Sequence, residues 1–140
     1  MLEAIHYFKL ENIEYFVYPR KNLIPFLLFC FKNFNTHLIT ASSKEYADNI
    51  LIALNIKDRF KTIKTREDLT KKEFKIKSPK SGMISIVEDY EKEINNGILV
   101  DDKDYIMSGI NNKLIQVSAF HPYVLDDELD RVIELLKNEL

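Results

Sequence analysis

The sequence predicts an α/β fold in which a parallel sheet lies between helices. Strand-like and helix-like segments alternate along most of the chain. Residues 98–100 form an unbroken aliphatic run, which is typical of a strand buried on both faces of a parallel sheet. Residues 126–140 have the apolar spacing of an amphipathic helix that can cover such a sheet.

The N-terminal part predicts a β-hairpin followed by a helix. Residues 5–10 and 13–18 are strand-like and flank a two-residue turn at Glu11-Asn12. Residues 23–33 then predict a helix, with Asn22 as its N-cap. Apolar side chains cover nearly the whole circumference of that helix, so we expect it to be buried under the sheet.

The next segments continue the alternation of strands and helices. Residues 36–40 predict a strand, and residues 44–54 predict a helix whose apolar side chains share one face. Either Ser42 or Ser43 can cap that helix. Residues 60–64 predict a short strand.

The C-terminal half begins with a polar, lysine-rich stretch. Residues 66–82 lack periodicity and predict an irregular surface excursion, whereas residues 83–94 have helical spacing. Residues 114–117 predict another strand after the one at 98–100. In the closing helix we expect five apolar residues to face inward: Leu129, Val132, Ile133, Leu135 and Leu136.

Composition narrows the class of protein. The 140 residues are expected to form a single domain, 1–140, and the net charge of −2 gives no electrostatic case for nucleic-acid binding. The single cysteine, Cys30, and the absence of a signal-like N-terminus predict an intracellular, cytoplasmic location. The longest apolar run, residues 23–31, contains Pro25 and is too short to span a bilayer, so no membrane association is expected.

Three groups of polar residues near predicted strand ends suggest phosphate chemistry. They are the hydroxyls of Thr40, Ser42 and Ser43, the amines of Lys75, Lys77 and Lys80, and the carboxylates of Asp101 and Asp102. Hydroxyls and backbone N–H groups at a helix start can cradle an anion, lysine can neutralise it, and carboxylates can hold a divalent metal. The alternative interpretation is structural: capping residues, a solvated basic loop and a solvated turn.

The sequence also resembles a known family. Residues 38–48 resemble the second motif of the carboxyl-terminal-domain phosphatases, also called NLI-interacting-factor-like phosphatases, of the haloacid dehalogenase superfamily. Residues 60–67 resemble the family's Phe-x-x-x-x-x-Arg-Glu stretch, and residues 98–102 resemble its fourth motif. Residues 126–136 resemble its closing Asp-Asp-Glu-Leu helix. In contrast, Lys21-Asn22 departs from the family's Arg-Pro-Gly segment.

The resemblance implies a Rossmann-like haloacid-dehalogenase core with an N-terminal β-hairpin. It also implies Mg²⁺-dependent hydrolysis of phosphoserine or phosphothreonine through an aspartyl-phosphate intermediate. The partner would be a phosphorylated protein or a small phosphate ligand. Substrate contacts are expected from Ser42, Arg66 and Lys77.

The resemblance also implies the catalytic roles. Thr40 would hydrogen-bond the transferring phosphoryl group, and Lys80, or alternatively Lys77, would neutralise its charge. Asp102 would hold the metal, and Asp101 would orient the lysine.

The first family motif, Asp-x-Asp-x-Thr, is missing. It supplies the nucleophile, and residues 1–22 contain no aspartate. We therefore expect a catalytically impaired or inactive relative with weak Mg²⁺ affinity. One alternative is an active phosphatase completed by another chain or by upstream sequence. Another is a non-catalytic interaction module that uses the basic segment 57–80.

The missing motif has a structural consequence as well. The first strand of the sheet would be truncated or rearranged, which would leave unpaired edges. We expect either that residues 5–10 fill the vacant position or that two chains pair there as a homo-oligomer.

Overall fold

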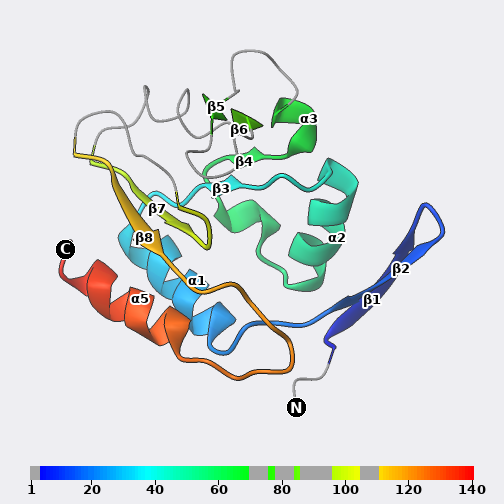
Figure 1. The fold of residues 1–140 in the computed structure, drawn as a ribbon, viewed down its shortest axis with the longest axis horizontal. Coiled ribbons are helices and arrows are strands. Elements are labelled where there is room, and N and C mark those ends of the chain that lie inside the picture. Colours follow the sequence, from blue (N-terminus) through cyan, green and yellow to red (C-terminus); the bar gives the residue numbers. More distant parts are fainter. Residues whose placement is uncertain (1–3, 70–75, 78–83, 86–95, 105–110) are drawn as a thin grey trace. The chain divides into compact units, whose positions relative to one another are not determined.

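The computed structural model describes residues 4–69, 76–77, 84–85, 96–104 and 111–140 (Figure 1). Its class is mixed α/β, and the described strands form four two-stranded sheets. The chain divides into two compact units. One comprises Met1–Leu38, Ser42–Ile63 and Phe120–Leu140, and the other comprises Ile39–Ala41 and Lys64–Ala119. The assignment of residues 1–140 to a single domain stays a prediction.

The N-terminal hairpin is confirmed. Strand β1 (His6–Leu10) pairs antiparallel with β2 (Ile13–Val17), both drawn in blue in Figure 1. Glu11 and Asn12 both have left-handed backbones, with φ of 50° and 65°, as a tight turn matched to the strand twist requires. Among the described strands β1 pairs only with β2, so the expectation that residues 5–10 fill a vacant sheet position is wrong.

One face of the hairpin packs on the rest of its unit. Phe8 is 7% exposed, and its ring lies 5.1 Å from that of Tyr15 and 5.5 Å from that of Tyr46 on helix α2 (Lys44–Ala53). An isolated two-stranded hairpin has little stability in water, so this aromatic cluster anchors it.

Helix α1 (Leu23–Asn33) spans the predicted residues, but its burial differs from the prediction. Phe26 and Cys30 are buried, whereas Ile24 is 38% and Leu28 is 45% exposed. The expectation that α1 is covered all round is therefore wrong. Apolar side chains on every side of a helix mean that the helix has no polar face. They do not tell how much of the helix surface is covered by neighbouring elements.

Helix α5 (Glu128–Lys137) contacts α1 in the same unit. Leu129, Val132 and Leu136 are buried as expected, and Val132 is fully enclosed. Leu135 is 39% exposed, so its predicted inward position is wrong. The buried residues follow the three- and four-residue spacing of one helical stripe, and Leu135 falls beside that stripe.

Polar contacts join the segment before α1 to the start of α5. The pairs are Arg20 with Asp126, Lys21 with Asp127, and Asn22 with Asp130. Asn22 occupies the N-cap position of α1 with φ 64°, but its side chain makes no capping hydrogen bond. Its amide instead donates to the Asp130 carboxylate at 2.7 and 2.9 Å, so the predicted cap acts as a tether between helices.

Helix α2 contributes to an apolar cluster of this unit. The Ser43 hydroxyl accepts a hydrogen bond from the Tyr46 backbone N–H at 3.1 Å, so Ser43 is the N-cap. The 3₁₀ helix η1 (Lys57–Arg59) follows α2. Ala47, Leu51 and Ile56 are buried, and the residues packed against them are Leu27, Phe31, Leu38, Leu54, Phe60 and Ile63.

Strands β3 (Leu38–Ile39) and β4 (Ile63–Lys64) are shorter than predicted. They pair with each other, through hydrogen bonds from Leu38 N–H to the Thr62 carbonyl at 3.0 Å and from Thr40 N–H to the Lys64 carbonyl at 2.9 Å. These bonds advance in the same direction along both strands, as in a parallel pair.

The segment after β4 has more regular structure than predicted. It begins with helix α3 (Arg66–Leu69), and β5 (Ile76–Lys77) pairs antiparallel with β6 (Ile84–Ser85). The prediction of an irregular excursion is therefore wrong at these positions, as is a helix beginning at residue 83. The remainder of that predicted helix, residues 86–94, lies outside the described residues.

Strand β7 (Ile98–Asp101) pairs in parallel with β8 (Lys113–Gln116), which confirms both predicted strands. All four residues of β7 are half-buried, so the prediction of burial on both faces is wrong for the described structure. The pair forms a two-stranded sheet among the described strands. A single Rossmann-like sheet between helices stays a prediction.

The described part of the chain contains no helix that is both long and apolar enough to cross a bilayer.

Candidate functional site

Thr40 lies at the carboxyl end of β3. Its backbone N–H donates to the Lys64 carbonyl at 2.9 Å, and the residue is half-buried. Strand pairing therefore fixes the backbone of Thr40 and limits where its hydroxyl can point. A residue held at a strand end in this way is suited to present one hydrogen bond to a ligand.

Arg66 is held beside the residue that follows Thr40. Its Nε donates to the Ala41 carbonyl at 3.0 Å, while the side chain remains exposed. Arg66 begins α3 directly after Thr65, which is 4% exposed and whose backbone N–H donates to the Asp68 carboxylate at 2.9 Å. A buried, hydrogen-bonded residue thus positions the arginine, and an exposed guanidinium is well suited to recognise phosphate.

Asp101 and Asp102 lie at the carboxyl end of β7. The Asp101 backbone carbonyl accepts from Val117 N–H at 2.9 Å, and its Oδ1 accepts from Lys103 N–H at 2.8 Å. Burial is the main cause that raises the pKa of Asp101, and the neighbouring Asp102 carboxyl adds to it, while the Lys103 N–H acts in the opposite direction. Asp102 itself is exposed.

A cation near this acidic pair would relieve the repulsion between its carboxylates. Carboxylate oxygens suit Mg²⁺, which commonly takes one or two protein carboxylates and completes its coordination with water and phosphate oxygens. Among residues 4–69, 76–77, 84–85, 96–104 and 111–140, no group of three or more histidine, cysteine or acidic side chains forms a metal site. The assignment of Asp102 to a metal therefore stays a prediction.

The predicted lysines are only partly described. Lys77 belongs to β5 and pairs in register with Ile84 of β6. Lys75 and Lys80 lie outside the described residues. The choice of the lysine that faces the phosphate therefore stays a prediction.

Of the two serines after Thr40, one has an assigned structural role. Ser43 caps α2, so the helix-start interpretation holds for that residue. Ser42 is half-buried, and its substrate-binding role stays a prediction. The structure thus brings Arg66 to the segment after Thr40, and it places Asp101 and Asp102 side by side at the end of β7. Convergence of the Thr40–Arg66 group and the aspartate pair on one pocket also stays a prediction.

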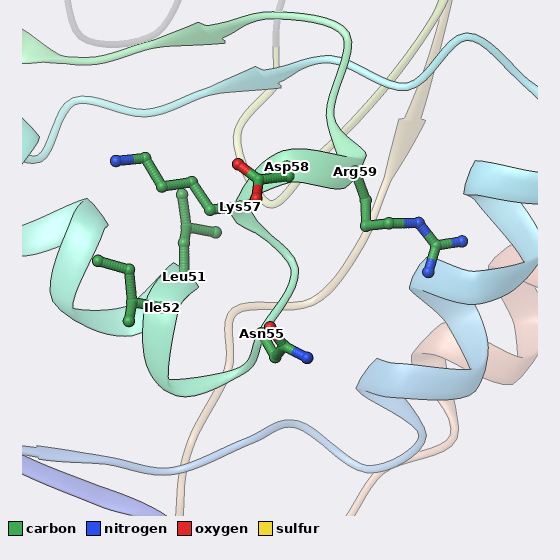
Figure 2. A pocket seen from close by; sticks show the side chains of 6 residues that line it. All are labelled: Leu51, Ile52, Asn55, Lys57, Asp58 and Arg59. Atoms are coloured by element: carbon green, nitrogen blue, oxygen red, sulfur yellow. The ribbon is translucent and has the colours of Figure 1, made fainter.

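A surface depression of about 570 Å³ lies at the C-terminal end of α2 (Figure 2). Its lining residues are Leu51, Ile52, Asn55, Lys57, Asp58 and Arg59. Lys57 Nζ lies 3.0 Å from the Asp48 carboxylate, and the Arg59 guanidinium lies 5.1 Å from the centre of the Phe31 ring. The sequence analysis did not predict this depression. The one sequence feature that points to it is the start of the basic segment 57–80, which contributes Lys57 and Arg59 to the lining.

In this mixed α/β protein a hydroxyl follows one strand and paired carboxylates follow another. The sequence matches the NLI interacting factor-like phosphatase family over residues 3–140, and the chain belongs to this family. It is similar to the CTD phosphatase-like protein 355R of Invertebrate iridescent virus 6. The two are 29% identical over 152 residues, which cover 99% of this chain and 82% of the viral protein. These matches confirm the resemblance drawn from the sequence motifs.

Proposed function

We propose that residues 1–140 form a haloacid-dehalogenase-type domain that binds a phosphorylated protein or small phosphate ligand without hydrolysing it. The observation that carries this proposal is the combination of family membership with a segment, residues 1–22, that contains no aspartate. Without an aspartate, this segment cannot form an aspartyl-phosphate.

Phosphate recognition is assigned to Thr40 and Arg66. The Arg66–Ala41 hydrogen bond holds the guanidinium near the end of β3, and strand pairing holds Thr40 there. Ser42 and one lysine, Lys80 or alternatively Lys77, would add contacts to the ligand. Fixed donors and cations of this kind stabilise charge on phosphoryl oxygens at little cost in reorganisation.

The acidic pair is assigned to Mg²⁺. Asp102, which is exposed, would hold the ion, and Asp101 would orient the lysine. The bound ion would supply Lewis-acid stabilisation of charge on the phosphoryl oxygens. Because this site has few protein carboxylates, we expect its affinity for Mg²⁺ to be weak.

Binding of inorganic phosphate tests the recognition half of the proposal. Phosphate should raise the melting temperature of the chain, and Thr40→Val should weaken phosphate binding by about tenfold, as expected for loss of one hydrogen bond to a charged group. Thr36→Val is the matched control and should bind as the unmodified chain does. Equal binding by all three proteins would contradict the assignment.

A turnover assay tests the second half of the proposal, which is that the chain does not hydrolyse the phosphate ligand. The purified chain, incubated with an aryl phosphate and Mg²⁺, should release no phosphate above background. Release that Asp102→Ala abolishes would overturn the impaired-enzyme proposal.

Completion by another strand is the second candidate, and the pairing of β7 favours it. Lys113 N–H bonds to the Gly97 carbonyl and Val117 N–H to the Asp101 carbonyl, so the backbone carbonyls of Gly97, just before β7, and of Asp101 face β8. The backbone polar groups of Ile98 and Val100 therefore face the other edge, where an added strand could pair. Turnover by protein expressed with the genomic sequence that precedes Met1, lost in Asp102→Ala, would establish this candidate.

The interaction-module candidate rests on the basic segment 57–80. Lys57 and Arg59 of this segment line the depression in Figure 2. Salt-sensitive binding to an acidic polypeptide should disappear on charge reversal of Lys75, Lys77 and Lys80 if this candidate is correct. In that case Thr40→Val should have no effect on the binding.

A further inference from the structure

The hairpin leaves one of its two faces open to solvent. Ile5, Tyr7, Phe16 and Tyr18 are 50%, 48%, 56% and 36% exposed, in contrast to Phe8 on the opposite face. The rings of Tyr7 and Phe16 lie 5.1 Å apart across the two strands. We call Ile5, Tyr7, Lys9, Glu14, Phe16 and Tyr18 the outer face.

The strand register explains why these side chains gather on one side. Tyr7 pairs with Phe16 and Lys9 with Glu14, and these pairs alternate with pairs that point toward α2. The Ile5 backbone N–H bonds to the Val17 carbonyl at 2.8 Å, which continues the pairing toward Tyr18. The outer face is therefore a continuous apolar strip that ends in one cation and one anion.

This strip is complementary to itself. A two-fold axis parallel to the strands would place each strand over the opposite strand of a second copy. Tyr7 would then lie over Phe16, and Lys9 over Glu14 of the other chain. Each residue on the outer face would thus lie opposite a copy of its own cross-strand partner. Aromatic rings would pack on aromatic rings, and each charge would lie opposite a charge of the other sign.

We propose that two copies of this chain associate through the outer faces of their hairpins around such an axis. The association is independent of phosphate binding. The outer face presents the side chains named above from a single hairpin, whereas a standard stable interface involves roughly 20–30 residues on each side. The dimer is therefore weak, with a dissociation constant in the range of about 1 μM to 1 mM.

Sedimentation velocity over about 1 to 500 μM protein tests the association, because a dimer of this affinity is measurably populated at the upper end of that range. The unmodified chain should shift from monomer to dimer, and Phe16→Ser should raise the dissociation constant by about tenfold or more. Ile52→Ser is the matched control, because Ile52 is 65% exposed on α2 and should leave the association unchanged. A monomer at every concentration, or an equal loss in Ile52→Ser, would overturn the proposal. Circular dichroism checks that each variant is folded.

A charge exchange tests the two-fold arrangement. Lys9→Glu should weaken the dimer, because it places like charges opposite each other across the axis. Adding Glu14→Lys to the same chain restores unlike charges and keeps the composition, so it should recover dimerisation. An unchanged dimer in Lys9→Glu, or no recovery in the double variant, would overturn this arrangement.

Discussion

Arg20 and Asp126, separated by 106 positions in the sequence, form an ion pair. Arg20 Nε lies 3.0 Å from one carboxylate oxygen and 3.1 Å from the other. The side chains are only 11% and 20% exposed, and the hydrogen bond from Arg20 is the main cause that lowers the pKa of Asp126. The Arg20 guanidinium also lies 5.9 Å from the centre of the Phe120 ring. This contact joins the segment before α1 to the start of α5.

Asp126→Asn should lower the free energy of unfolding by about 1–3 kcal/mol, between the values typical of exposed and buried pairs. Urea denaturation followed by circular dichroism measures the change. Lys21→Ala is the control, because the Lys21 and Asp127 side chains are 45% and 75% exposed and solvent screens their pair, so its loss should cost less than that of the Arg20–Asp126 pair. A larger loss in Lys21→Ala than in Asp126→Asn would contradict the ranking.

Asp101→Asn should stabilise the fold at neutral pH. The folded-state pKa of Asp101 is raised, chiefly by burial, so the ionised form costs stability above the ordinary value of 3.8. As pH falls through the raised pKa, the carboxyl takes up a proton and that cost disappears. The stability difference between the two proteins should therefore shrink on acidification, as thermal melts at pH 7 and pH 4 would reveal. A difference independent of pH would contradict this explanation.

The hairpin turn can be improved. Glu11 and Asn12 both adopt left-handed backbone conformations, for which Asn-Gly is the preferred pair. The double variant Glu11→Asn/Asn12→Gly should stabilise the chain by about 1 kcal/mol in urea denaturation, because the left-handed backbone costs more at Glu than at Asn or Gly. Asn22→Gly is the contrasting variant. Asn22 also has a positive φ, but the substitution should destabilise the chain because it removes the hydrogen bonds from the Asn22 side chain to Asp130.

Val132→Ala should cost about 2 kcal/mol of unfolding free energy, because Val132 has 0% exposure in the α5 stripe. Leu135→Ala removes more atoms, but it should cost less than about 1 kcal/mol since Leu135 is 39% exposed. The same denaturation experiment compares the two. The reverse order would place Leu135 on the inward face that periodicity alone predicted.

Local sequence signals predicted the elements with strong periodicity or turn chemistry. The Glu11-Asn12 turn located the hairpin, and the Ser42-Ser43 pair located the start of α2. Strands β5 and β6 escaped prediction because a two-residue strand has no measurable period. Helical spacing identified the α5 stripe, but it could not decide whether Leu135, at its border, is covered.

The candidate site was predictable at the level of strand ends. The family motifs located Thr40 and the Asp101–Asp102 pair, whereas nothing in the sequence indicated that the Ala41 carbonyl accepts from Arg66. That contact depends on how α3 follows β4, which is a tertiary property. For the same reason, spacing gave no hint that the side chain of Asn22 reaches Asp130.

The burial of Cys30 makes labelling experiments simple. Burial raises the pKa of its thiol to about 11, so thiolate, the form that reacts with maleimides and iodoacetamides, is scarce at neutral pH. Because Cys30 is the single cysteine of the chain, a second cysteine placed on the surface would react selectively. A spectroscopic probe can thus be attached at a chosen position without first removing the native thiol.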